Sequence, residues 1–299
     1  MKAADPSPRG QQAPDRLLTG ILAMLMAMFA MTILDALAKW LGAGYPISEV
    51  VFFRSLFGLL PVLAVAWLSG GRASLRVREP GLHLLRAAFL LGAGFSFFFA
   101  LRFLGLAEAI AIAFLSPVFV TALSVPILGE AVGPRRWAAV AVGFLGALII
   151  VRPSGDSFTW AAVLPATAAF CYALAMLLTR RLSRSNSTAS LMMSATLLGC
   201  LASAALLPFG WRTPDAEDFL LFVLLGLVGG TGSYFMTLAY RSAPAAVIAP
   251  FEYSTLLWGA LIGWLVWHEL PDGWTWTGAT ILAASGLYIL HRERGVSRR

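Results

Sequence analysis

The chain has 299 residues, of which 59% are hydrophobic and only 12% are charged. Soluble domains carry a charge on about a quarter of their residues, so this composition excludes a soluble globular protein and indicates a membrane protein. A formal net charge of +7 could suit a nucleic-acid partner, but the placement of the basic residues argues against one.

The first sixteen residues, MKAADPSPRGQQAPDR, are polar and rich in proline. We expect residues 1–16 to form a disordered cytoplasmic tail. The apolar run that follows is longer than the roughly 7–15 residues of a secretory signal's apolar core. The sequence therefore predicts a first helix that is retained in the membrane.

Apolar runs continue along the rest of the chain. Each has or approaches the roughly 20 residues that a helix needs to cross a bilayer, and none alternates as a membrane β-strand does. The sequence predicts an all-α integral membrane protein with ten transmembrane helices. They are expected at about 17–41, 46–69, 82–101, 107–128, 136–151, 158–179, 188–208, 218–240, 244–267 and 274–291.

The basic residues indicate the orientation of these helices, because cytoplasmic loops are enriched in Lys and Arg. Cytoplasmic termini place most of the 22 Lys and Arg residues on the cytoplasmic side. Only Lys39, Arg102, Arg152 and Arg212 then lie near the opposite face. We expect a multi-pass protein of the bacterial inner (plasma) membrane, whose arginines contact lipid headgroups and bind no nucleic acid.

The two halves of the chain look like copies. The stretch LGEAVGPRRWAAVAVGFLGALIIV at 128–151 is similar to WHELPDGWTWTGATILAASGLYIL at 267–290, with Glu130 matching Glu269 and Trp137 matching Trp276. We expect five-helix repeats at 17–151 and 158–292 and a cytoplasmic tail at 293–299. Because five is odd, the second repeat is inverted, which is the architecture of many secondary transporters.

Four motifs carry a resemblance to a known family: ILGE, GFLGALIIV, HELPDGWTWTG and FFRS. From about residue 17 to 291 the chain resembles the EamA family of the drug/metabolite transporter superfamily. The resemblance implies ten helices in an inverted arrangement, a central cavity lined mainly by helices 1–4 and 6–9, and peripheral helices 5 and 10, so that we expect a monomer. In layout the chain is similar to aromatic amino acid and methyl viologen exporters, whereas DALAKWL and FEYS are similar to members that carry S-adenosylmethionine.

Charged residues interrupt the first two helices. The first helix contains Asp35 and Lys39, and a turn near Gly44 should place Asp35 opposite Arg54 and Lys39 opposite Glu49. A charge at the bilayer centre costs about 3 kcal/mol or more, which pairing reduces. These four side chains either staple the two helices together or form a gate or coupling site in which Asp35 exchanges a proton.

The ninth helix carries the other notable charge, Glu252, with no basic residue near it in sequence. It is expected either to line the substrate path or to be a protonated side chain bonded to a neighbouring helix. Pro117 and Pro250 deprive the carbonyls of Ala113 and Ala246 of their usual donors. Helices 4 and 9 should therefore be broken and border the substrate path, because broken backbone in a membrane lies inside the protein or along a cavity.

Aromatic side chains complete the expected substrate site, since they can stack on a planar substrate or hold a cation. The alternative for most of them is packing against lipid. The aromatic candidates are Phe95, Phe99, Tyr172, Tyr234, Phe251 and Tyr253.

Several classes of function are disfavoured. The two lysines, Lys2 and Lys39, follow no phosphate-binding glycine pattern, and the chain has neither an HExxH nor a GxSxG motif. We therefore expect no enzyme activity, cofactor or metal. The favoured function is export of amino acids, aromatic ones included, by alternating access. The alternatives are a carrier or exchanger of S-adenosylmethionine or another cationic metabolite and, in a different class, a non-transporting membrane scaffold.

Overall fold

The computed structural model describes residues 12–68, 71–129, 133–151, 159–242 and 248–296. Within these ranges every regular element is helical. The α-helices are α1 (Gln12–Gly44), α2 (Ile47–Leu68), α3 (Pro80–Ala100), α4 (Leu106–Ala113), α5 (Ser116–Leu128), α6 (Pro134–Val151), α7 (Val163–Leu182), α8 (Thr188–Ala204), α9 (Ala216–Ser242), α11 (Ser254–Trp267) and α12 (Gly273–Val296). The short 3-10 helices are η1 (Gly71–Leu75), η2 (Trp160–Ala162), η3 (Leu207–Phe209) and η4 (Ala249–Tyr253).

The elements follow the predicted spans, with α4 and α5 forming the fourth and η4 and α11 the ninth. Seven segments in the described part of the chain are long and apolar enough to cross a membrane. The first and last helices extend beyond the expected spans, and the cytoplasmic position of the two tails stays a prediction. The first helix begins at Gln12, inside the segment expected to be disordered, and the last continues to Val296; residues 1–11 and 297–299 lie outside the described ranges.

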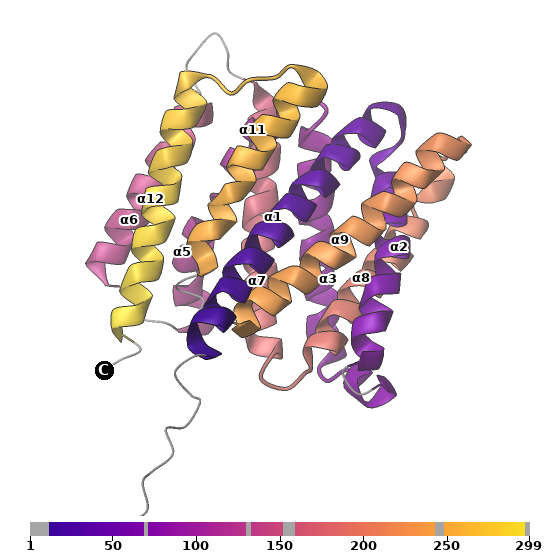
Figure 1. Cartoon of the computed structure of the whole chain (residues 1–299), viewed down its shortest axis with the longest axis horizontal. Coiled ribbons are helices and arrows are strands. Elements are labelled where there is room, and N and C mark those ends of the chain that lie inside the picture. The colour runs from indigo at the N-terminus through magenta and orange to yellow at the C-terminus, as the bar shows by residue number, and fades with distance from the viewer. Residues whose placement is uncertain (1–11, 69–70, 130–132, 152–158, 243–247, 297–299) are drawn as a thin grey trace, which may run out of the picture.

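The packing pairs the two halves in a matched way. α1 packs against α9, and α7, which holds the corresponding place in the second half, packs against α3. α2 packs against α8, α4 against α11, and α6 against α12, which lie together at one edge of the bundle in Figure 1. Each of these last three contacts joins an element to its own counterpart.

The bundle has two ends. α1 begins and α12 ends at the same one (Figure 1), which we call the terminal face. The opposite end, the distal face, carries the turns at 41–47, 101–106, 210–216 and 268–273.

Glycines allow α9 and α2 to approach closely. A methyl group added to Gly226 would lie 2.4 Å from Cβ of Phe57 and 2.8 Å from the backbone nitrogen of Gly58, and one added to Gly230 would lie 2.4 Å from Cγ of Pro61. Such contacts are shorter than van der Waals packing permits. Gly226 and Gly230, which have GxxxG spacing, thus lie at a close contact between two helices, as is common in membrane proteins.

Two arginines clasp the α1–α2 turn on the distal face. Arg102 donates through Nε to the carbonyl of Gly42 at 2.7 Å and through Nη2 to that of Tyr45 at 2.6 Å. Arg212 donates through Nη1 to the carbonyl of Gly44 at 2.7 Å. Arg102 and Arg212 are two of the basic residues expected on the side of the membrane opposite the cytoplasm. Their hydrogen bonds give each a structural reason to lie at the distal face.

Tyr45 joins the same turn to the start of α9. Its buried hydroxyl donates to Oδ2 of Asp218 at 2.7 Å, and this bond raises the pKa of Tyr45 above its usual value of 10.0. A group whose pKa is raised on folding stabilises the folded state at every pH below its unfolded-state pKa. The hydrogen bond of Tyr45 should therefore stabilise the protein throughout the range from pH 6 to 9.

We expect Tyr45→Phe to lower the stability of the protein, because the Asp218 carboxylate loses a hydrogen-bond donor. The measurement is the apparent Tm of the purified protein at pH 6, 7.5 and 9, with the exposed Tyr288→Phe as the control. A loss that disappeared below pH 9 would contradict the assignment.

Candidate functional site

The breaks in the two discontinuous spans meet inside the bundle. Phe114 follows the last residue of α4, and Tyr253 precedes the first residue of α11. Their rings stack with centroids 4.7 Å apart and an interplanar angle of 24°. Pro117 lies in the first turn of α5, and Pro250 lies in η4. The expected break near Pro117 is present, whereas Ala246 lies outside the described residues.

Glu252 lies in η4 beside the second break. The hydroxyl of Tyr240, near the end of α9, donates a hydrogen bond to Oε1 of Glu252. Thr255 donates through Oγ1 to the backbone carbonyl of Glu252 at 2.7 Å. The carboxylate is therefore oriented by a side chain from a neighbouring helix, and among the described residues no hydrogen-bond donor is bonded to Oε2.

Further tyrosines surround this carboxylate. Tyr172 of α7 and Tyr253 both interact electrostatically with Glu252. Although Tyr172 and Tyr240 face Glu252, 37% and 38% of their surfaces remain exposed. The cluster of Tyr172, Tyr240, Glu252 and Tyr253, here called the tyrosine–glutamate cluster, is thus reached from outside the core rather than sealed within it.

Asp35 and Arg54 form a second polar group, on α1 and α2. The two charges are close enough to influence each other, as their similar distance from the turn predicts, but they form no ion pair within 4 Å in the described part of the chain. The Arg54 guanidinium lies 5.3 Å from the centre of the Phe98 ring and beside Gly94. α3 thus forms a third wall around this pair of opposite charges.

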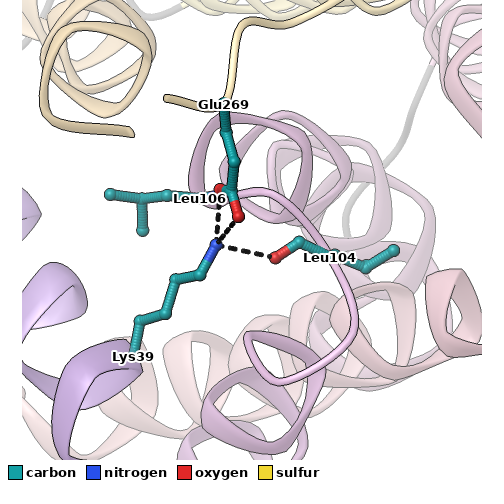
Figure 2. A network of polar contacts seen from close by, with 4 residues as sticks. All are labelled: Lys39, Leu104, Leu106 and Glu269. Carbon is teal, nitrogen blue, oxygen red and sulfur yellow. Dashed lines mark hydrogen bonds and ion pairs between the residues drawn. The ribbon is translucent and has the colours of Figure 1, made fainter. Parts of the chain in front are cut away.

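Lys39 does not pair with Glu49, and that prediction was wrong. Figure 2 shows Lys39 bonded to Glu269 in the α11–α12 turn, with Nζ 2.7 Å from Oε1 and 2.5 Å from Oε2. Lys39 also donates to the carbonyl of Leu104 at 3.2 Å, and the amide of Leu106 donates to Oε2 of Glu269 at 3.3 Å. Depth along the first hairpin could not predict this partner, because it comes from the other half of the chain.

Glu49 is fully buried and has a different partner. Its Oε2 accepts a hydrogen bond from the backbone amide of Arg212 at 3.1 Å, and this links α2 to the segment before α9. Glu49 thus belongs with the distal clasp of the α1–α2 turn rather than with Lys39.

The remaining aromatic candidates lie in other surroundings. Phe99 packs edge-on against Phe103 at 5.3 Å, near the distal face. Phe95 packs against the main core, and Phe251 packs against a smaller core between α1 and α9. Tyr234 is 44% exposed and contacts Phe235. The contacts of these four residues do not join them to the tyrosine–glutamate cluster.

Three residues of these sites were not singled out as candidates from the sequence: Phe114, Tyr240 and Glu269. Tyr240 follows Tyr234 by six residues in GSYFMTLAY, and nothing in that spacing marked it as the partner of Glu252. Glu269 was noted only as a repeat marker. Within the described residues no group of three or more His, Cys, Asp and Glu side chains is placed to hold a metal ion.

Arg86 and His83 form a buried polar group towards the terminal face. Arg86 donates through Nη2 to the carbonyl of Leu191 and, at 3.4 Å, to Ser194. Nδ1 of His83 lies 2.6 Å from Oγ of Ser194. These bonds fasten α3 to α8, so the termini of the two helices are held together near this face.

Comparison with known proteins gives consistent results. Residues 18–152 and 159–291 each match the EamA-like transporter family. Over 294 residues the chain is 32% identical to a riboflavin transporter of Rhizobium johnstonii, covering 96% of this chain and 95% of that protein. It is 26% identical to an S-adenosylmethionine uptake transporter of Rickettsia felis, covering 94% and 96%. It is also 29% identical to a pseudopaline exporter of Pseudomonas aeruginosa, covering 94% and 99%.

Proposed function

Because the chain belongs to the EamA-like transporter family and is a multi-pass protein of the bacterial inner membrane, we propose that it is a secondary transporter of riboflavin or a closely related planar heteroaromatic compound. The proposal is supported by 32% identity to a riboflavin transporter over almost the whole of both chains. It is also supported by the tyrosine–glutamate cluster, which is the observation on which the chemistry depends.

The cluster suits a flat molecule with polar edges. A flavin ring has two broad apolar faces and an imide N–H that can donate to a carboxylate, and its ribityl chain carries several hydroxyls. Aromatic side chains favour offset or edge contacts with such a ring. Tyr172 offers an aromatic ring beside Glu252, and Oε2 of Glu252, to which no described donor is bonded, can accept from the imide.

The transport mechanism that we propose is alternating access between two inverted five-helix repeats with cytoplasmic termini. The matched contacts α1–α9 and α7–α3, together with the meeting of the two broken spans, support it. Inverted repeats of this kind move against one another around a site near the middle of the membrane. The protein acts as a monomer, with a small molecule and membrane lipids as its partners.

The test is riboflavin flux into liposomes that carry the purified protein, with and without an imposed pH gradient. We expect saturable flux that unlabelled riboflavin competes away. Empty liposomes provide the background. If riboflavin does not move in either direction under either condition, the proposed substrate is wrong.

S-Adenosylmethionine is the second candidate, since a relative carries that name and a carboxylate among aromatic rings can hold a cation. Amino-acid export remains a prediction that the names of these relatives do not specifically support. Adding S-adenosylmethionine and phenylalanine as competitors separates the three substrates. A membrane scaffold would move none of them.

A further inference from the structure

Lys39 has two possible carboxylate partners, and the structure shows it with one of them. It is bonded to Glu269 of the α11–α12 turn. Asp35 lies four residues earlier on α1, one helical turn away on the same face. An acidic residue four positions before a lysine is the favourable order for a pair within a helix, so Lys39 can exchange one partner for the other by changing its side-chain rotamer.

The bond to Glu269 joins the two halves of the chain at the distal face. Lys39, Leu104 and Leu106 come from the first half and Glu269 from the second (Figure 2). The ammonium also lies 4.8 Å from the centre of the Trp267 ring. Three stretches of the chain, at residue 39, at 104–106 and at 267–269, therefore converge on one ion pair, which lies one turn distal to Asp35.

The ion pair between Lys39 and Glu269 can break because one of its two side chains is open to solvent. The side chain of Lys39 is only 9% exposed, whereas that of Glu269 is 38% exposed. An ion pair with one partner open to solvent is easier to break than a sealed one, whereas a buried lysine with no partner is strongly unfavourable. A second carboxylate within reach removes that cost, because Lys39 is then paired in both states.

We propose that Lys39 is a two-position gate residue, bonded to Glu269 when the distal face is closed and to Asp35 when it is open. The inference rests on the proposed alternating-access function, but it names the side chains that select between the two states. Asp35 thereby becomes the residue that stabilises the open state, and Glu269 the residue that stabilises the closed one.

The test is a distance measurement across the distal face that needs no substrate. Ala43 at the end of α1 and Leu270 in the α11–α12 turn are both exposed. Each is replaced by cysteine in a background that carries Cys171→Ala and Cys200→Ala, spin-labelled, and measured by double electron–electron resonance in nanodiscs. Opening of the face appears as a longer distance.

We expect Glu269→Gln to raise the population of the longer distance at least threefold. Adding Asp35→Asn to Glu269→Gln should reverse that gain, because Lys39 then has no full charge to pair with in either state. The control is Glu217→Gln, an exposed carboxylate at the start of α9, which should leave the distribution unchanged. Lys39→Arg, which keeps both pairings, should resemble the wild type.

A charge exchange separates the gate from a fixed staple. In Lys39→Glu with Glu269→Lys the distal pair is restored, but residue 39 now repels Asp35. A gate predicts a longer-distance population below that of the wild type, because the open state has lost its ion pair, whereas a staple predicts the wild-type distribution. The proposal is overturned if Glu269→Gln does not lengthen the distance or if Asp35→Asn has no effect on it. If the distances shift as expected but riboflavin is not transported, only the proposed substrate is wrong.

Discussion

Replacing Glu252 by Gln should lower kcat/KM for riboflavin transport by about 10-fold to 100-fold. The substitution keeps the size of the side chain and removes its charge, and a hydrogen bond to a charged group is worth about 1.5–3 kcal/mol. Each 1.4 kcal/mol corresponds to a factor of ten. The measurement is initial flux into liposomes over a range of riboflavin concentrations.

Two variants make this result specific. Tyr240→Phe leaves the carboxylate but removes the donor that orients it, so we expect a smaller loss of several-fold, about 1 kcal/mol. Glu217→Gln, an exposed carboxylate away from the cluster, should transport as the wild type does. Normal flux in Glu252→Gln at wild-type protein levels would make Glu252 a structural residue and would remove the cluster from the substrate path.

The second large effect concerns stability. Gly226→Ala should lower the free energy of unfolding by about 1–3 kcal/mol, the usual cost of forcing a methylene or methyl group into a filled interior. The added carbon would lie 2.4 Å from Cβ of Phe57 and 2.8 Å from a backbone atom of Gly58. Backbone cannot move aside as a flexible side chain can, so α9 and α2 must separate.

The matched control for this substitution is Gly81→Ala. Gly81 is also helical, in α3, but an added Cβ there meets no atom within 4 Å. Because alanine favours a helix over glycine by about 1 kcal/mol, the control should raise the apparent Tm slightly. If both variants lowered the apparent Tm equally, the close contact between α2 and α9 would not limit stability.

The helices were predictable because a bilayer requires long apolar runs, and each expected span contains a helix. The break near Pro117 was predictable for a local reason, the missing amide hydrogen. The stacking of Phe114 on Tyr253 was not, because it depends on how the fourth and ninth spans meet in three dimensions.

The charged residues within the helices also show which contacts the sequence could predict and which it could not. Similar depth along one hairpin predicted Asp35 near Arg54, and these two charges do influence each other. The same reasoning failed for Lys39, whose partner Glu269 follows it by more than two hundred residues. Contacts between halves that are far apart in sequence depend on tertiary packing, which hydrophobic patterning within either half does not specify.

The arginine clasp on the α1–α2 turn has an evolutionary consequence. Arg102 and Arg212 bind the backbone carbonyls of Gly42, Gly44 and Tyr45 rather than their side chains. Every amino acid supplies such a carbonyl, so mutation of an exposed position in this turn, such as Ala43, leaves the grip intact. Exposed positions of this turn can therefore change in sequence without loosening it, whereas Tyr45 is constrained by the hydrogen bond of its side chain to Asp218.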